Sequence, residues 1–412
     1  MIAALLAIAL LGAAADQKLL PGAEGKLCLG CHQDFEARLH KPFVHTPMKE
    51  GKCTDCHRAH ASQHGKLLDQ DASKICLGCH AAVIPAGAKS VHAPVAKGSC
   101  VACHDPHSSD DKFELLKPQA QLCASCHAGI ADAAFRARFK HEPMNKGASC
   151  STCHDAHASA NGTALLRHDE PALCLSCHKP GKEMDRAHSG YPVATSRCSS
   201  CHDPHGSNRK GMLFDTVHKP VATRQCADCH AAAGSAAPLA LKQEGVQLCQ
   251  GCHKDKVALM TGKAQIHEAI VDGKGCLNCH AAHASKKPGL LRGTQIAVCG
   301  SCHADTIRRQ EQSPTKHVPV QGGDCTACHD PHASEAPLLL IKANTVDLCG
   351  KCHDWQKHAS HPIGEKLKDP RNQNMSLDCL SCHRAHGTEY KHMNPYPTTT
   401  ELCTKCHQQF KR

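Results

Sequence analysis

Apolar residues along this chain occur in short groups rather than in long periodic runs. Apolar and polar residues do not alternate over any sustained stretch, so few β-strands are expected. A Leu or Val stands just before one class of cysteine-rich segments, which should form short helical turns, and residues 136–141 and 254–270 should extend into helices. The pattern predicts a loop-rich chain with short α-helices and little or no β-structure.

Prolines add a second expectation. Five of them stand two residues after a histidine, and because proline is excluded from helix interiors they should keep these segments extended. They are Pro47, Pro94, Pro143, Pro220 and Pro319.

The 32 cysteines form sixteen Cys-x-x-Cys-His motifs with none left over, about one motif per 26 residues. This motif is the attachment signature of c-type haem, in which two thiols bond the vinyl groups of one porphyrin and the histidine binds its iron. We therefore expect sixteen covalent haems. The cysteine pairs are Cys28 and Cys31, Cys53 and Cys56, Cys76 and Cys79, Cys100 and Cys103, Cys123 and Cys126, Cys150 and Cys153, Cys174 and Cys177, Cys198 and Cys201, Cys226 and Cys229, Cys249 and Cys252, Cys276 and Cys279, Cys299 and Cys302, Cys325 and Cys328, Cys349 and Cys352, Cys379 and Cys382, and Cys403 and Cys406.

Composition supports this interpretation. Aromatic residues make up only 3% of the chain, too few for an ordinary apolar core, which the porphyrins would replace. A disulfide framework or a set of zinc ribbons could also use paired cysteines. Neither alternative explains a histidine after every second cysteine, or 36 histidines in total.

The formal net charge of +10 does not indicate a nucleic-acid partner. Each haem brings two propionates, and each ferric iron leaves one positive charge on its ring. Sixteen oxidised haems would change the net charge to roughly −6, so many lysines are expected to offset propionates.

Residues 1–15 are uncharged and apolar and end in a run of small residues, which resembles a secretory signal. The run is short for a membrane-spanning helix. Export agrees with the motifs, because c-type haem is attached outside the cytoplasm. We expect a periplasmic or outer-membrane protein, or alternatively an extracellular one.

Two kinds of motif alternate with a period of about 50 residues. In the paired-His motifs a second histidine, here called the post-motif histidine, follows three residues after the first. The other kind, the Leu-type motifs, is preceded by Leu or Val and lacks this histidine. Cys226 begins a degenerate paired-His motif with Ala-Ala-Ala in its place. The period is irregular around residues 206–211, which predicts two octahaem halves, 16–211 and 212–412.

The motif histidines are the expected proximal iron ligands. They are His32, His57, His80, His104, His127, His154, His178, His202, His230, His253, His280, His303, His329, His353, His383 and His407. Twenty histidines remain, enough for a sixth ligand on every iron, so all irons are expected to be six-coordinate with two histidines.

A set of upstream histidines mostly precedes the paired-His motifs by eight to ten residues. Ten extended residues span roughly 30 Å, enough to pass round a porphyrin, so each upstream histidine is assigned to the haem that follows it. The set is His45, His92, His141, His188, His218, His267, His317 and His361, with His358 competing for the last role.

A post-motif histidine cannot reach the far side of its own haem. We assign each one to the preceding Leu-type haem, for example His107 to the haem at Cys76. The set is His60, His107, His157, His205, His283, His332 and His386. This rule leaves the Cys403 haem unserved; His392 is the first candidate for it, and His40 of a neighbouring molecule, in a head-to-tail assembly, is the second.

The repeat His-x-Pro, Cys-x-x-Cys-His-x-Pro-His, Leu-Leu, Leu-Cys-x-x-Cys-His resembles the doubled Cys-x-x-Cys-His multihaem cytochromes. Within them it looks like the decahaem conduits of porin–cytochrome complexes. Residues 90–127, 186–206 and 315–353 carry the resemblance best, and it extends over nearly the whole chain from Cys28. It implies an outer-membrane porin as a partner, although this chain has sixteen motifs rather than ten.

We expect an extended, haem-cored electron wire rather than an enzyme, with redox proteins as partners. Extracellular electron transfer through a periplasmic or outer-membrane conduit is the first hypothesis. A subunit of an extracellular cytochrome filament is the second, and a multihaem reductase the third. A reductase often has a lysine in place of one motif histidine, and no Cys-x-x-Cys-Lys occurs here.

Overall fold

The computed structural model describes residues 23–145, 149–162, 164–357 and 363–410. The predicted signal at residues 1–15 and the predicted ligand His361 lie outside the described residues. The chain divides into two compact units, Met1–Leu173 and Cys174–Arg412. The predicted boundary after Gly211 lies inside the second unit.

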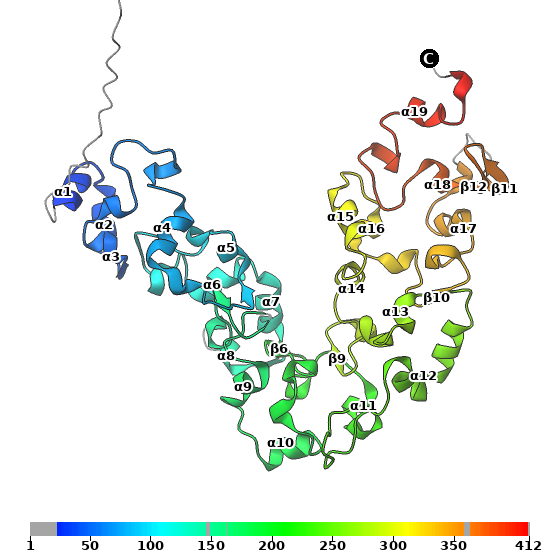
Figure 1. Cartoon of the computed structure of the whole chain (residues 1–412), viewed down its shortest axis with the longest axis horizontal. Helices are drawn as coiled ribbons and strands as arrows, with labels where there is room; N and C mark the ends of the chain where they lie inside the picture. Colours follow the sequence, from blue (N-terminus) through cyan, green and yellow to red (C-terminus); the bar gives the residue numbers. More distant parts are fainter. Residues whose placement is uncertain (1–22, 146–148, 163, 358–362, 411–412) are drawn as a thin grey trace, which may run out of the picture. The chain divides into compact units, whose positions relative to one another are not determined.

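The first unit consists of short helices joined by loops (Figure 1). Its helices are α1 (Ala23–Leu29), α2 (Asp34–Arg38), α3 (Thr46–Lys49), α4 (Ala72–Cys79), α5 (Ala93–Ala96), α6 (Gln119–Ala124), α7 (Ala128–Arg136), α8 (Glu142–Asn145) and α9 (Glu170–Leu175), which runs into the second unit. Its strands are β1 (Phe43–Val44), β2 (Ser90–Val91), β3 (Ser108–Ser109), β4 (Phe139–Lys140) and β5 (Ala158–Ser159).

The second unit has the same character. Its helices are α10 (Lys182–Ala187), α11 (Lys219–Ala222), α12 (Gly245–Thr261), α13 (Glu268–Val271), α14 (Gln295–Gly300), α15 (Ala304–Gln312), α16 (Val318–Gly322), α17 (Thr345–Cys349), α18 (Cys379–Cys382) and α19 (Thr399–Cys403). Its strands are β6 (Gly206–Ser207), β7 (Thr216–Val217), β8 (Gln265–Ile266), β9 (Ala284–Ser285), β10 (Ala333–Ser334), β11 (Gly364–Asp369) and β12 (Asn372–Leu377).

Short 3-10 helices complete both units. One set lies on the paired-His motifs: Cys53–Asp55, Cys100–Ala102, Cys150–Thr152, Cys198–Ser200, Cys226–Asp228, Gly275–Asn278 and Cys325–Ala327. A second set follows these motifs: Gly65–Leu67, Lys112–Glu114, Lys210–Met212, Pro288–Leu290, Pro337–Leu339 and Lys391–Met393. The others are Ala81–Val83, Val193–Thr195, Trp355–Lys357 and Gln408–Phe410.

The expectation of short helices, loops and few strands is confirmed, and helical turns lie on the Leu-type motifs as predicted. Two local predictions are wrong. The segment 136–141 is not helical, because α7 ends at Arg136 and β4 follows. The segment 254–270 is not one helix, because α12 ends at Thr261, β8 follows, and α13 begins only at Glu268.

The prolines also act differently from the prediction. Pro47, Pro94, Pro220 and Pro319 stand in the first turns of α3, α5, α11 and α16. A proline is tolerated there because the first amide groups of a helix have no intrahelical partner. The extended backbone ends at the histidine before each helix; β1, for example, runs into His45, which has φ −59° and ψ 133°.

Two-residue antiparallel ladders connect parts of the chain that are far apart in sequence. Within the first unit β1 pairs with β3, with Phe43 opposite Ser109, and β2 pairs with β5. Within the second unit β7 pairs with β9, and β8 with β10. Each ladder joins the segment before an upstream histidine to the segment after a post-motif histidine.

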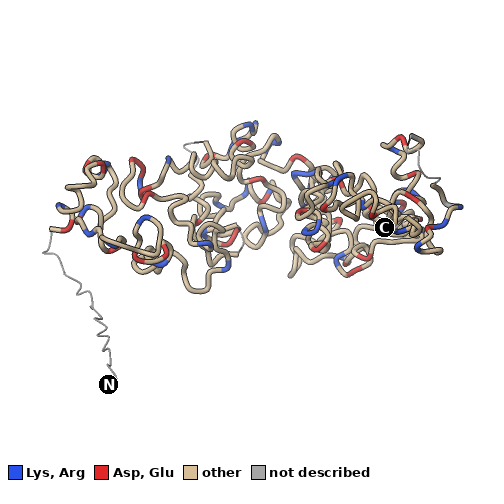
Figure 2. Tube along the Cα trace, turned by 90° about the horizontal axis from the view of Figure 1, so that it is seen from above, with Lys and Arg blue, Asp and Glu red and all other residues tan. Residues whose placement is uncertain are grey.

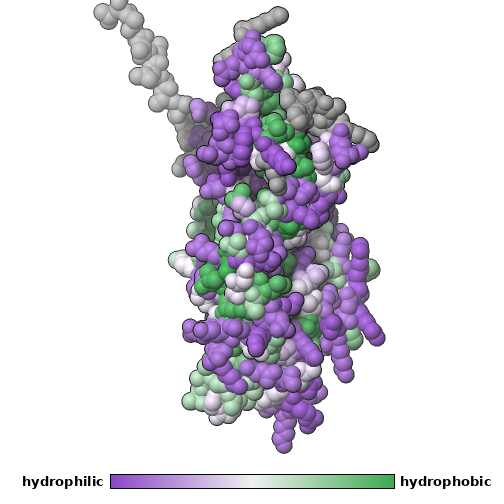
Figure 3. Space-filling model, turned by 90° about the vertical axis from the view of Figure 1, so that its right-hand side faces the viewer, coloured by the Kyte–Doolittle hydropathy of each residue, from purple (hydrophilic) through white to green (hydrophobic). Residues whose placement is uncertain are grey.

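Small residues form the buried interior. The side chains below 9% exposure in the described residues include Ser108, Ala158, Ala284 and Ala333, all of them in the ladders. Larger apolar side chains reach the surface, among them Phe113 at 62% and Leu338 at 78% exposure. On the face shown in Figure 3 small hydrophobic patches lie between hydrophilic residues, and Figure 2 shows both signs of charge interspersed along the chain.

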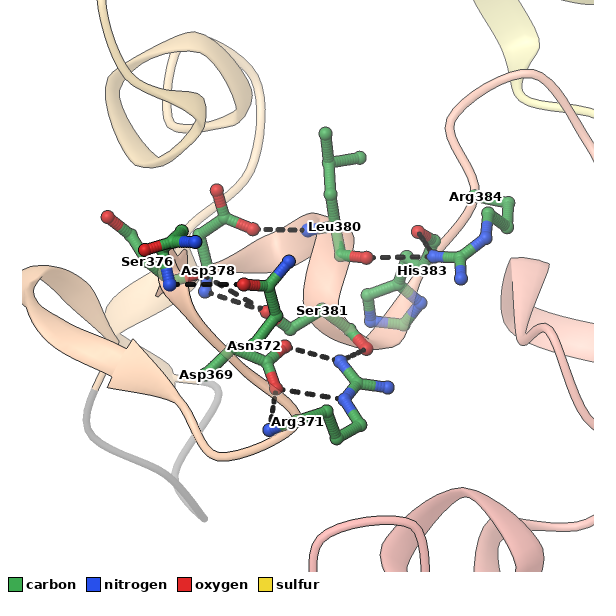
Figure 4. A network of polar contacts seen from close by, with 10 residues as sticks. Asp369, Arg371, Asn372, Ser376, Asp378, Leu380, Ser381, His383 and Arg384 are labelled. Atoms are coloured by element: carbon green, nitrogen blue, oxygen red, sulfur yellow. Dashed lines mark hydrogen bonds and ion pairs between the residues drawn. The ribbon is translucent and has the colours of Figure 1, made fainter.

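The β11–β12 hairpin departs from the repeat. Its Asp369 side chain is 4% exposed and forms an ion pair with Arg371, whose Nη2 also donates to the carbonyl of Ser381 at 2.7 Å (Figure 4). Ser381 lies inside the Cys379 motif, so the hairpin is fastened to that motif. None of the helices in the described part of the chain has the length and apolar character that a membrane crossing needs.

Candidate haem sites

Every Cys-x-x-Cys-His motif is one turn of helix. Leu-type motifs lie on α-helices, as Cys76 does on α4, whereas most paired-His motifs lie on 3-10 turns, as Cys100 does. In both kinds the backbone N–H of the proximal histidine donates to the carbonyl of the first cysteine, as at His80 (2.8 Å) and His104 (3.2 Å). This turn brings two thiols and one imidazole into the close group that covalent haem attachment requires.

Each paired-His motif is followed by a loop that returns to its proximal histidine. Nδ1 of His104 lies 2.8 Å from the carbonyl oxygen of Phe113, and Nδ1 of His280 lies 2.6 Å from that of Gly289. A carbonyl oxygen only accepts hydrogen bonds, so Nδ1 carries the proton and Nε2 keeps its lone pair for a metal. The same contact, at 2.7–2.9 Å, is made by His57, His154, His202, His230, His329 and His383.

The accepting carbonyls mostly belong to left-handed turns. Phe113 and Glu114 have φ values of 64° and 51°, and Leu338 and Leu339 both have 57°. Such values cost a residue other than glycine about 1–2 kcal/mol. The two consecutive carbonyls are both used, because Asp105 N–H donates to Glu114 at 2.8 Å while His104 donates to Phe113. These turn residues were not singled out in the sequence; a Leu-Leu pair ten to twelve residues after the proximal histidine, as at Leu115-Leu116, is their signal in most repeats.

Upstream histidines face the proximal histidines of Leu-type motifs. Their ring centroids are 5.8–6.2 Å apart, the ring planes differ by 16–24°, and the two members are 35 or 36 residues apart in sequence. The pairs are His45 with His80, His92 with His127, His218 with His253, His267 with His303, and His317 with His353.

Post-motif histidines face the proximal histidine of the preceding paired-His motif. Here the centroids are 5.9–6.1 Å apart and the planes differ by 9–34°. The pairs are His107 with His57, His157 with His104, His283 with His230, His332 with His280, and His386 with His329.

These spacings fit an iron between the two rings. A metal–nitrogen distance of about 2 Å on each side, with about 1.1 Å from each nitrogen to its ring centre, places two axial imidazoles roughly 6.2 Å apart. Stacked rings in direct contact can approach more closely, down to about 4.5 Å. The residues of these pairs therefore fit a haem iron held by two histidines.

The predicted partner rules are wrong for ten of the eleven pairs in the described residues. Upstream histidines do not face the motif that follows them, and post-motif histidines do not face the preceding Leu-type motif. The ladders are the physical reason. The β1–β3 ladder holds His45 beside His107, with His45 N–H donating to the His107 carbonyl at 2.9 Å and His45 Nδ1 to that of Pro106 at 2.9 Å. One ladder thus directs two histidines onto the two motifs of a single repeat, at Cys76 and Cys53.

The pair of His188 with His202 agrees with the prediction, because His202 belongs to the motif that follows and the two ring centroids are 6.1 Å apart. The degenerate Cys226 motif explains the exception. This motif has no post-motif histidine that could face His202, because Ala233 occupies the position. The Cβ of Ala233 lies 3.8 Å from a Cβ built on Gly190, close to His188 in the chain. Tyr191, which the sequence analysis did not use, lies beside His230 and donates to the Ala231 carbonyl at 2.7 Å.

Some predicted ligands are not brought to a proximal histidine in the described part of the chain. The His60 ring does not lie against that of His32. His392 is exposed, lies against no other ring there, and uses its backbone carbonyl to accept from His383 Nδ1 at 2.9 Å. The prediction that His392 is the sixth ligand of the Cys403 haem is therefore not supported. The predicted roles of His141 and His205 as axial ligands stay predictions.

Thiols of successive motifs also act on one another, through first cysteines and second cysteines alternately, except that the second cysteine Cys201 meets the first cysteine Cys226. Burial, followed by repulsion from the Cys100 thiol, raises the pKa of Cys76 to about 11, and the two thiols are hydrogen-bonded. The second cysteines Cys56 and Cys79 lie close enough for the charge of one to raise the pKa of the other.

These contacts continue through each unit. In the first they join Cys28 with Cys53, Cys103 with Cys126, and Cys123 with Cys150. In the second they join Cys201 with Cys226, Cys229 with Cys252, Cys249 with Cys276, Cys279 with Cys302, Cys299 with Cys325, Cys328 with Cys352, Cys349 with Cys379, and Cys382 with Cys406.

The disulfide and zinc alternatives have no counterpart in the structure. None of the 32 cysteines, all of them within the described residues, forms a disulfide. Within the same residues no group of three or more His, Cys, Asp or Glu side chains is arranged to hold a metal ion.

A family model described as the doubled CXXCH motif matches the chain eight times, at residues 45–84, 92–132, 141–183, 191–217, 218–258, 267–308, 317–358 and 372–412. Six of these matches begin at an upstream histidine. A search of the curated proteins found no match. The matches cover well over half of the chain, and the chain therefore belongs to the doubled CXXCH family, as a multihaem c-type cytochrome with several covalently bound haems.

Proposed function

We propose that this chain binds sixteen c-type haems and acts as an electron-transfer wire for extracellular electron transfer. The bound haems supply one-electron Fe(III)/Fe(II) chemistry. The chain's own residues hold the haems in sequence order, orient the axial imidazoles and place neighbouring sites against each other.

The alternating thiol contacts carry this proposal. Within Met1–Leu173 they join each motif to the next from Cys28 to Cys150, and within Cys174–Arg412 they do so from Cys201 to Cys406. Because a porphyrin is bonded to both thiols of each motif, neighbouring thiols imply neighbouring haem edges. A series of close redox sites suits electron conduction.

The histidine pairs support a wire over a reductase. An iron with imidazole on both faces has no position left for a substrate. Eleven such pairs occur in the described residues, and the chain contains no lysine variant of the motif. We accordingly propose a non-enzymatic electron carrier that is exported to the periplasm or outer membrane, with redox proteins and an outer-membrane porin as partners.

Intact-mass spectrometry of the purified holoprotein tests the haem load. Sixteen haems at about 0.6 kDa each should add roughly 10 kDa to the chain. Twelve or fewer haems, or bound zinc, would overturn the proposal. Electron microscopy of the same material separates a dispersed conduit from a head-to-tail filament, and filaments would move the assignment to the extracellular alternative.

A further inference from the structure

The axial histidines differ in what their Nδ1 atoms face. Nδ1 of the proximal histidines in paired-His motifs, and of upstream histidines such as His45 and His267, lies against a backbone carbonyl, at 2.9 Å and 2.8 Å in those two cases. Nδ1 of the post-motif histidines His107 and His332 has no carbonyl acceptor within the described residues. Each of them faces a carboxylate instead.

This carboxylate stands two residues before the post-motif histidine. Oδ1 of Asp330 lies 3.7 Å from Nδ1 of His332, and Oδ1 of Asp105 lies 3.6 Å from Nδ1 of His107. Both distances are too long for a hydrogen bond, so the carboxylate acts as a nearby charge. The backbone fixes it, because Oδ1 of Asp330 accepts from the N–H of His332 at 2.9 Å and from that of Ala333 at 3.4 Å.

Not every repeat has this carboxylate. Asp155 stands in the same place before His157 and accepts its N–H at 3.2 Å. Ala281 takes the position before His283, and Arg384 takes it before His386. The charge of Arg309 also acts on His386 and helps to lower its pKa, after burial and the charge of His329. Chemically similar iron sites therefore differ by one to two units of charge at the position two residues before one axial ligand.

We infer that the residue two positions before each post-motif histidine sets the reduction potential of the iron that this histidine binds. A carboxylate there stabilises the ferric state, in which the iron–porphyrin ring carries a positive charge, and lowers the potential. The sites at Cys53, Cys100 and Cys276 are then the more reducing ones, and those at Cys226 and Cys325 the more oxidising ones. This inference rests on the two-histidine sites of the proposed function.

Nearby cations should make the lowering of the reduction potential differ among the sites that have an aspartate. Asp105 forms an ion pair with Arg38, which offsets part of its charge. Asp330 has no Lys or Arg in an ion pair within the described residues, and the cation that also acts on His332 there is the more distant Lys256.

Asp330→Asn in the full holoprotein is the most direct test. The asparagine oxygen can still accept from His332 and Ala333, so the substitution removes the charge and keeps the turn. We expect the ferrous form of one haem to be favoured about tenfold, an upward shift of about 59 mV for a one-electron couple. The difference between variant and wild-type potentiometric titrations should have the amplitude of a single haem.

Two further variants complete the test. Ala281→Asp adds the charge at the Cys226 site, where His283 faces His230, and should lower one potential by a similar amount. Asp132→Asn removes the same charge from a 68% exposed position on α7 and should leave the titration unchanged. If Asp330 had a purely structural role, Asp330→Asn would lose haem or its low-spin spectrum, and the reduction potential of a single haem would not shift.

The outcomes separate this inference from the proposed function. Unchanged haem content and spectra without any shift in Asp330→Asn would overturn the inference alone. A shift of equal size in Asp132→Asn would also overturn it, because the effect would then be one of net charge. A wild-type protein without sixteen low-spin haems would instead contradict the proposed function.

Discussion

The rings of His57 and His107 lie with their centroids 6.1 Å apart and their planes within 11° of each other, although 50 residues separate them in the sequence. His57 belongs to the paired-His motif of one repeat and His107 to that of the next. A repeat of this chain therefore does not complete its own paired-His site. The next repeat completes it, which couples neighbours in the way expected of repeat proteins.

Replacing His107 with Ala should open the haem site at Cys53, not those at Cys76 or Cys100. Removal of one axial imidazole converts a low-spin iron to a high-spin one, so we expect one new high-spin signal in the EPR spectrum that added imidazole abolishes. His168→Ala, at an exposed histidine outside the pairs, should be silent. In a chain with Cys53 and Cys56 both changed to Ser, His107→Ala should add no signal; a signal that persists there would assign His107 to another haem.

The exchange of ligand at the degenerate motif can be reversed. His188→Ala should make the Cys198 site high-spin, because its ring faces His202. Adding Ala233→His to that variant restores a histidine three residues after His230, close to Gly190, and should return the site to low spin. The matched control is Ala232→His in the same background, which places the imidazole one residue out of register. Rescue by both substitutions, or by neither, would contradict the conclusion that a histidine three residues after His230 is placed to meet His202.

The motif spacing alone was enough to predict the haem-binding cysteines and the proximal histidines, because five consecutive chain positions define that chemistry. It could not predict which distal histidine meets which motif. That choice depends on ladders of two residues, such as Phe43–Val44 with Ser108–Ser109, whose strands lie about 65 residues apart and show no periodic pattern. The ten residues between an upstream histidine and the next motif are long enough to reach that haem. This length permits the predicted assignment but does not require it.

Two signals in the sequence could have improved the prediction. Small residues follow the post-motif histidines, as in Ser108-Ser109 and Ala333-Ser334, and they are buried where two backbones approach. The constant interval of 35 or 36 residues between an upstream histidine and its partner is the other. The β11–β12 hairpin had no comparable signal, because its strands are rich in charged and amide residues and poor in those that favour strands.

Strain at the left-handed turns predicts opposite effects at two equivalent positions. Gly289 has φ 63° with no heavy atom within 4 Å of a built Cβ, so Gly289→Ala should cost about 1 kcal/mol through the backbone alone. Leu338 occupies the same place in its turn with φ 57°, and Leu338→Gly should relieve a similar strain.

Hydrogen exchange measures both turns. The Ala281 N–H donates to Leu290 at 2.7 Å and the Asp330 N–H to Leu339 at 2.7 Å. About 1 kcal/mol corresponds to roughly fivefold in an opening equilibrium, so Ala281 should exchange about fivefold faster in Gly289→Ala. Asp330 should exchange more slowly in Leu338→Gly. Equal effects of the same sign in both variants would show that apolar cover, and not backbone strain, controls these turns.

The hairpin at β11–β12 should loosen in acid. The hydrogen bond from Arg371 holds the pKa of Asp369 well below its usual range, so the carboxylate stabilises the hairpin fully above about pH 4, near the ordinary aspartate value. As the pH falls below that value towards the pKa in the folded hairpin, the open form takes up a proton first and the stabilisation declines. Hydrogen exchange of residues 364–377, corrected for intrinsic rates, should show constant protection from pH 7 to 5 and loss near pH 3.

Arg371→Gln leaves Asp369 buried without its cation and should cost about 2–4 kcal/mol at neutral pH. The control, Arg384→Gln, removes a guanidinium that donates to the carbonyls of Leu380 and His383 and should change hairpin protection little (Figure 4). If Arg371→Gln left the protection at pH 7 unchanged, the ion pair would not be what holds this hairpin to the Cys379 motif.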